Sequence, residues 1–86
     1  MKEIKLTVSG LDVDFEDAQS IAKSIASRKN PETDLMAWYD KTHDRHSPSI
    51  VECNKEDTPG WEEYGRHHGG KLEIKINNGD YVFIYT

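Results

Sequence analysis

The sequence predicts an α+β domain in which a mainly antiparallel sheet of four to five strands packs against one long helix, with a second, short helix. Residues 2–8 and 71–76 alternate between apolar and polar side chains, as half-buried strands do. Residues 15–26 repeat apolar side chains every three or four positions, which is the helical period. The expected order is β-α-β-β-α-β-β, in a single domain over residues 1–86.

The first strand is predicted over residues 2–8, and its apolar face carries Ile4, Leu6 and Val8. The long helix follows, with Asp14 as a suitable N-cap and acidic residues in the first turn. We expect this helix to stop at Asn30-Pro31, because the residue before a proline avoids the α conformation.

The middle of the chain is predicted as two further strands. Residues 35–39 place Met36 and Trp38 on one face and Leu35, Ala37 and Tyr39 on the other. Both faces are largely apolar, which indicates a central strand. A polar loop is expected over residues 41–48, and a third strand over residues 49–53, antiparallel to the second.

The short helix is predicted to begin with Thr58 as N-cap and Pro59 at its first position, and to end at Gly69-Gly70. A hairpin follows, because Asn78-Gly79 is the preferred two-residue loop between antiparallel strands. This loop pairs residues 72, 74 and 76 with 85, 83 and 81 on the core face. The other face bears Glu73, Lys75, Val82 and Ile84; it is half apolar, and we expect something to cover it in part.

Composition narrows the classes of partner. The formal net charge of the 86 residues is −5, from 16 acidic and 11 basic side chains without a basic run. Binding to phosphates needs a Lys/Arg footprint, so we expect neither a nucleic acid nor a membrane surface as partner. The single cysteine, Cys53, cannot form an internal disulfide, and no apolar leader or membrane-spanning run is seen. We therefore expect a cytoplasmic protein.

Reactive side chains concentrate between Trp38 and His68, a stretch that holds all four histidines and the only cysteine. One hypothesis is a zinc site, since imidazole and thiolate both suit zinc. Its ligands would come from His43, His46, Cys53, His67 and His68. The spacing matches no standard zinc motif, so surface histidines, a buried thiol and no cofactor are favoured over zinc.

A second hypothesis makes Cys53 a nucleophile, with His46 or His67 as base and Asp40 or Glu52 as orienter. The favoured alternative is that Cys53 is a small buried hydrophobe. Paired carboxylates drawn from Asp40, Glu52, Glu62 and Glu63 are a weaker hypothesis, because acidic side chains are mostly exposed.

A third hypothesis is a ligand or partner surface formed by Trp38, Asp40, Trp61 and Tyr64, since Trp and Tyr are enriched at interfaces. The favoured alternative places Trp38 in the core and lets Trp61 and Tyr64 pin the short helix onto the sheet.

Several runs resemble a known family. They are Met36-Ala37-Trp38-Tyr39-Asp40, Ser47-Pro48, Glu52-Cys53, Pro59-Gly60-Trp61-Glu62 with Tyr64, Gly69-Gly70, and Asp80-Tyr81-Val82-Phe83-Ile84-Tyr85. They resemble a small uncharacterised family, a domain of unknown function found in archaea and anaerobic bacteria. The resemblance covers nearly the whole chain after the first helix. It implies a compact α+β fold, no assigned activity and no site residues, and it does not include the four histidines.

Three function classes remain open. We favour a non-enzymatic binding or protein-interaction module that uses the Trp38–His68 region, because no catalytic constellation is identified. The alternatives are a metal- or thiol-dependent enzyme centred on Cys53 and the histidines, and a structural homodimer subunit. In the last case the dimer would form through the half-apolar face that bears Val82 and Ile84. The partner is expected to be a protein or small molecule, and the chain a monomer or weak homodimer.

Overall fold

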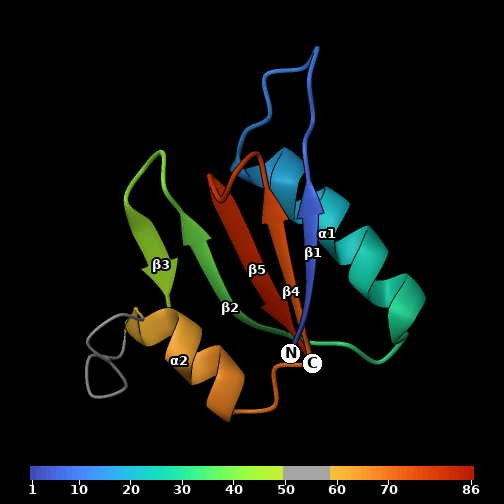
Figure 1. The fold of residues 1–86 in the computed structure, drawn as a ribbon, viewed down its shortest axis with the longest axis vertical. Helices are drawn as coiled ribbons and strands as arrows, with labels where there is room; N and C mark the ends of the chain where they lie inside the picture. Colours follow the sequence, from blue (N-terminus) through green and yellow to red (C-terminus); the bar gives the residue numbers. More distant parts are fainter. Residues whose placement is uncertain (50–58) are drawn as a thin grey trace.

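The computed structural model describes residues 1–49 and 59–86. Within them the chain runs β1 (Lys2–Leu6), α1 (Phe15–Lys29), β2 (Leu35–Asp40), β3 (Arg45–Ser47), α2 (Gly60–His67), β4 (Leu72–Ile76) and β5 (Tyr81–Tyr85). The five strands form one sheet in the order β1-β4-β5-β2-β3 (Figure 1). Only β1 and β4 pair in parallel, so the predicted α+β fold with a mainly antiparallel sheet is confirmed.

Helix α1 covers one face of the sheet (Figure 1). Asp14 caps it as predicted: its side chain accepts a hydrogen bond from the Asp17 backbone, and the Asp17 side chain accepts one from the Asp14 backbone. The buried stripe of the helix consists of three alanines, Ala18, Ala22 and Ala26. Small side chains let the helix lie close to the sheet, and they share a core cluster with Ile74, Ile76 and Phe83.

Helix α2 covers the opposite face. Trp61 of α2 forms a second core cluster with Ala37, Val82 and Ile84. The half-apolar face of the hairpin is therefore covered, as expected, and the covering element is α2. Val82 is 4% exposed and Ile84 is fully buried. The prediction that a homodimer forms through this surface is therefore wrong, because α2 of the same chain covers it. The oligomeric state itself stays a prediction.

The C-terminal hairpin has the predicted register, from Ile76 opposite Tyr81 to Leu72 opposite Tyr85. Asn78 and Gly79 adopt φ values of 60° and 87°, the positive values that a type I′ turn requires at both central positions. The Asn77 side chain also accepts a hydrogen bond from the Val8 backbone at 2.8 Å. This contact ties the segment after β1 to the hairpin, and β1 ends at Leu6 rather than at Val8.

The faces of β2 differ from the alternation in the sequence. A register irregularity lies between Leu35 and Ala37, where β2 pairs with β5. Met36, which lies within this irregularity, packs with the α2-side cluster, while Leu35 and Trp38 on either side of it pack with the α1-side cluster. The predicted grouping of Met36 with Trp38 was wrong, because one irregular residue reverses the alternation on one side of it.

The region after β2 contains two further corrections. Residues 45–47, which were predicted as loop, form β3 and pair antiparallel with residues 38–40. The strand predicted over residues 49–53 lies outside the described residues except for Ser49, which is not in a strand. Helix α2 begins at Gly60 with Pro59 as N-cap and without a side-chain cap; Thr58, the predicted cap, lies outside the described residues.

In the described ranges 1–49 and 59–86, no helix is both long and apolar enough to cross a membrane.

Candidate functional site

A cluster of polar side chains lies where β2 ends and β5 begins. Asp40 is the last residue of β2, and it pairs with Tyr81 at the start of β5 and with Arg45 at the start of β3. Its carboxylate is almost buried, at 4% exposure for the residue. The sheet register therefore puts a charged group at the point where three strands meet.

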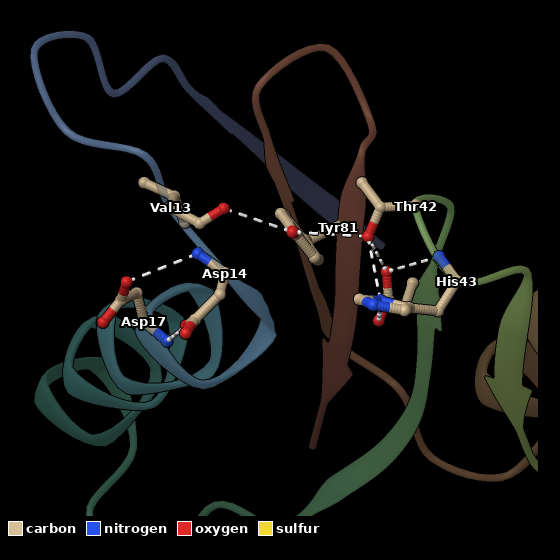
Figure 2. A network of polar contacts seen from close by, with 7 residues as sticks. Val13, Asp14, Asp17, Thr42, His43 and Tyr81 are labelled. Atoms are coloured by element: carbon tan, nitrogen blue, oxygen red, sulfur yellow. Dashed lines mark hydrogen bonds and ion pairs between the residues drawn. The ribbon is translucent and has the colours of Figure 1, made fainter.

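The residues that follow Asp40 bend back onto its carboxylate, and Figure 2 shows Thr42, His43 and Tyr81 in the resulting network. The Thr42 hydroxyl donates to Asp40 Oδ1 at 2.7 Å, and the His43 backbone N–H donates to the same oxygen at 3.3 Å. The His43 ring nitrogen Nδ1 lies 2.8 Å from Asp40 Oδ2. Tyr81 Oη donates to the Val13 carbonyl at 3.2 Å and lies 3.5 Å from Thr42 Oγ1. We call Asp40, Thr42, His43 and Tyr81 the Asp40 network.

The contacts determine the charge of Asp40. Burial on its own raises the pKa of this carboxyl, because it disfavours the charged form. The hydrogen bonds from Thr42 and His43 outweigh burial, and the net pKa lies below its ordinary value. Asp40 is therefore an ionised acceptor in a nearly buried place, and its hydrogen bonds are charge-assisted.

The ring of His43 combines a fixed orientation with exposure. Nδ1 faces the buried Asp40 carboxylate, whereas 65% of the side chain is exposed. Nε2, the other ring nitrogen, is therefore left for an outside group. Thr42 Oγ1 also lies 3.1 Å from Nδ1, while its hydroxyl donates to the Asp40 carboxylate; the Tyr81 hydroxyl donates to the Val13 carbonyl. These contacts orient the His43 ring, so the ring is a positioned contact group.

The other histidines make similar contacts elsewhere. His46 Nδ1 lies 3.1 Å from the Pro48 carbonyl, and His68 Nδ1 lies 2.9 Å from the Tyr64 carbonyl. His67 Nε2 lies 2.9 Å from Glu63 Oε2, one turn earlier on α2. Each histidine thus has one ring nitrogen on an oxygen acceptor.

The predicted zinc ligands are not gathered into a site within residues 1–49 and 59–86, where no three His, Cys, Asp or Glu side chains could hold a metal ion. Cys53 and Glu52, which the metal and thiol hypotheses use, lie outside these ranges. The favoured expectation of no cofactor and its alternative, a zinc site, therefore both stay predictions.

The aromatic residues of the predicted partner surface are separated by the sheet. Trp38 packs against Phe15 on the α1 side, with ring centroids 4.8 Å apart. Trp61, 6% exposed, stacks on Tyr39 on the α2 side at 5.3 Å and an interplanar angle of 9°. Tyr64 stacks on His68 at the end of the same helix. The core role of Trp38 and the pinning role of Trp61 are confirmed; Tyr64 is not part of that cluster.

Of the residues predicted for partner binding, only Asp40 belongs to the Asp40 network. Thr42 and Tyr81 were not among the predicted site residues, and the pairing of His43 with Asp40 was not predicted. Two signals point to them: a histidine three residues after a strand-terminal aspartate, and a hairpin register that places Tyr81 at the strand end.

The comparisons with known proteins agree with the fold. The model of a family described as "Domain of unknown function (DUF5619)" matches residues 1–85. The chain belongs to this family. The resemblance seen in the sequence, to a small family without an assigned activity, is thereby confirmed.

A solved structure is also similar. It is the crystal structure of a novel protein, AF1514, from Archeoglobus fulgidus DSM 4304, with 28% sequence identity and a TM-score of 0.82. The match covers 100% of this DUF5619 chain and 93% of the other chain, so the two share the whole fold. No curated protein matches the chain. The comparisons thus establish a family and a fold, and they assign no activity.

Proposed function

We propose that this DUF5619 domain is a non-enzymatic binding module and that the Asp40 network is the point at which its partner makes contact. One observation carries the proposal: His43 is 65% exposed, yet its ring is held at 2.8 Å by a buried carboxylate. A side chain that is ordered before binding loses less conformational entropy when the partner arrives.

The exposed nitrogen suggests what the partner presents. When Nδ1–H donates to Asp40, the neutral ring offers a lone pair on Nε2 to a hydroxyl or amide donor; the imidazolium form would donate to an acceptor instead. The net charge of −5 argues against a nucleic acid. The partner is a protein or a small molecule with a polar contact group, and a chain with one cysteine is suited to the reducing cytoplasm.

The test is a matched pair of histidine variants. The purified domain, immobilised, captures partners from an extract of the cells that encode it, and mass spectrometry quantifies them against His43→Ala and His46→Ala. His46 is the control, because it is exposed and its ring, among the described residues, is hydrogen-bonded to the Pro48 carbonyl and to no carboxylate. We expect His43→Ala to capture at least tenfold less partner than the wild type and Asp40→Asn to show a smaller decrease. His46→Ala should capture as much as the wild type. Equal capture by the two alanine variants would contradict the proposal.

A second candidate is the metal- or thiol-dependent enzyme. It is favoured by the carboxylate–imidazole pairs Asp40–His43 and Glu63–His67, because metal-ligating histidines usually carry such a partner on their other nitrogen. The metal content of reduced protein purified without chelator tests it, together with the thiol pKa of Cys53. Near-stoichiometric zinc that is lost in His43→Ala or His67→Ala supports this candidate, whereas metal-free protein with an ordinary thiol pKa removes it.

A further inference from the structure

An acidic side chain lies on the covered face of an inner strand. Glu73 is in β4, between β1 and β5, and it pairs with Ile84 in the register of the hairpin. The residue is only 3% exposed. Its Oε2 atom is buried and has no hydrogen-bond partner among the described residues. A buried carboxylate without a partner destabilises a fold, and protonation of the carboxyl removes the cost of the buried charge.

Helix α2 places a second carboxyl beside it. Glu62, with a side chain 16% exposed, raises the pKa of Glu73 and pairs with Arg66 at 3.8 Å. On the sheet side, the charge of Lys75 lowers the pKa of Glu73, and Lys75 pairs with Glu3 of β1 at 2.9 Å. The β2 and β5 neighbours on this face, Ala37, Val82 and Ile84, are apolar.

The cations near Glu73 are paired with other carboxylates. Glu3 pairs with Lys75 at 2.9 Å and with Lys5 at 3.6 Å, and Glu62 pairs with Arg66. Glu73 itself forms no ion pair with the described residues, and in its protonated form it can donate its O–H to Glu62. Burial, and next the Glu62 carboxyl, raise the pKa of Glu73 from 4.5 to about 8. The other acid on the buried side of α2, Glu63, is paired with His67 and is a separate contact.

We propose that Glu73 and Glu62 form a proton-controlled latch that holds α2 against the sheet. When Glu73 is protonated, α2 stays packed on the sheet. When Glu73 loses the proton, its carboxylate and that of Glu62 repel each other with little water to screen them. Helix α2 has only eight residues, too few to be stable without packing. Its release would uncover the apolar face formed by Ala37, Val82 and Ile84.

The apolar part of the α2 contact depends on one large side chain. Trp61 is the large apolar residue that α2 buries; it stacks on Tyr39 and packs in one cluster with Val82 and Ile84. Gly65 also lies close to Ile84. Gly69, just beyond the helix, has a φ of +98°, a conformation that glycine adopts without strain.

The direction of the pH effect follows from the pKa values of Glu73. In the closed state the pKa is about 8, and in the open state it returns toward 4.5. The closed state therefore binds the proton more tightly, and opening becomes easier as pH rises between these two values. The opening constant should increase about tenfold for each pH unit in this window and level off above about pH 8.

Amide hydrogen exchange tests the latch. Exchange of the α2 amides is measured from pH 5.5 to 9 and corrected for the intrinsic pH dependence of exchange. We expect the corrected opening of α2 to rise about tenfold per pH unit up to about pH 8, and α2 to open more readily than α1. Glu73→Gln should remove the slope. Glu63→Gln is the matched control on the same helix and should keep it.

Two further measurements separate folding defects from the latch. If Glu73→Gln does not fold, carbon-detected NMR titration of the Glu73 carboxyl in the wild type gives its pKa, and Glu62→Gln should lower that pKa. A flat exchange profile in the wild type, a Glu73 pKa near 4.5, or identical protection of α1 and α2 at every pH would each overturn the latch. None of these results bears on His43, so the latch and the proposed binding function fail independently.

Discussion

Asp40 and Glu73 are two carboxyl groups with nearly the same small exposed fraction and opposite shifts in pKa. They are 4% and 3% exposed, and burial is the largest influence on the pKa of each. Asp40 receives donors from the loop that follows it, which lowers its pKa. Glu73 faces another carboxyl, which raises its pKa further. Glu73 lies deeper and faces a carboxyl, whereas Asp40 lies at the sheet end and is supplied with hydrogen-bond donors; the two differences together decide which of the two is charged.

Replacing Asp40 by alanine should destabilise the domain. The change leaves the Thr42 hydroxyl and the backbone N–H of His43 without their acceptor, and we expect a loss of about 1 to 3 kcal/mol in the free energy of unfolding by urea. Asp44→Asn is the control, because Asp44 is exposed and asparagine tolerates its φ of 49°.

The Asp40 effect should also depend on pH. Since the folded pKa of Asp40 lies below its ordinary value of 3.8, its contribution is present above that value and is lost as pH falls through the folded pKa. The difference between wild type and Asp40→Asn should therefore shrink in acid. A difference that stays constant down to pH 2, in protein that is still folded, would refute this assignment.

Gly65 allows α2 to approach the sheet, and an added methyl group should disturb that contact. A Cβ at this position would lie 2.8 Å from Ile84 Cδ1, on a fully buried side chain. Alanine favours the helix by up to about 1 kcal/mol, but overpacking costs about 1 to 3 kcal/mol. We expect Gly65→Ala to lower the free energy of unfolding by about 1 kcal/mol net.

A double-mutant cycle with Ile84→Val checks the cause of the Gly65→Ala effect. Valine lacks Cδ1, the atom nearest to the added methyl, so the two changes together should cost less than the sum of their separate effects. Additive costs would mean that Gly65→Ala acts through something other than this contact.

At the scale of elements, α1 is the segment whose local signals agree best with its structure. The predicted cap, the acidic first turn and the stop before Pro31 are all present, and the helix ends at Lys29. This agreement arises because capping and the apolar period act over neighbouring residues.

Removing the cap of α1 should weaken the fold by a small, measurable amount. Asp14→Ala loses the acceptor for the Asp17 backbone N–H at 2.8 Å, and we expect a decrease of about 1 kcal/mol in the free energy of unfolding. Asp14→Ser retains a capping oxygen and should recover most of it. If serine and alanine are equally destabilising in urea unfolding, the cap does not contribute as described.

Strand β3 shows why short polar elements escape sequence analysis. Its three residues, Arg45-His46-Ser47, are polar and carry no apolar alternation. What makes them a strand is pairing with β2 across a turn in which Asp44 adopts a positive φ. The irregular residue in β2 could not be predicted from the sequence for a related reason, since its position depends on the pairing of β2 with β5.

For the whole molecule, stability should decline as pH rises through neutrality. Glu73 has a raised pKa in the folded state, so its contribution is fully present below 4.5 and is lost as pH rises through about 8. Urea unfolding from pH 5 to 8.5 should show a decrease of roughly 2 to 4 kcal/mol. The groups with lowered pKa values, Asp40 and Glu3, titrate below this window and do not mask the effect.

Glu73→Gln isolates this contribution. Glutamine has a similar shape and does not ionise, so the variant should lose most of the dependence on pH and should be more stable than the wild type above pH 8. A wild-type stability that is constant or increasing from pH 5 to 8.5 would contradict the raised pKa of Glu73.

The sequence by itself determined the class of fold, the helix α1 with its cap, and the register of the β4–β5 hairpin, because these depend on contacts between near neighbours and on the period of apolar residues. It also indicated that the face of Val82 and Ile84 would be covered. Only the tertiary structure decided the strand order, the choice of α2 as the cover, and the partners of Asp40 and Glu73. Tyr81 lies 41 positions from Asp40 in the chain, and Glu73 meets Glu62 across a helix–sheet contact. The pKa of each carboxyl depends on groups that folding brings together, so no local pattern could predict it.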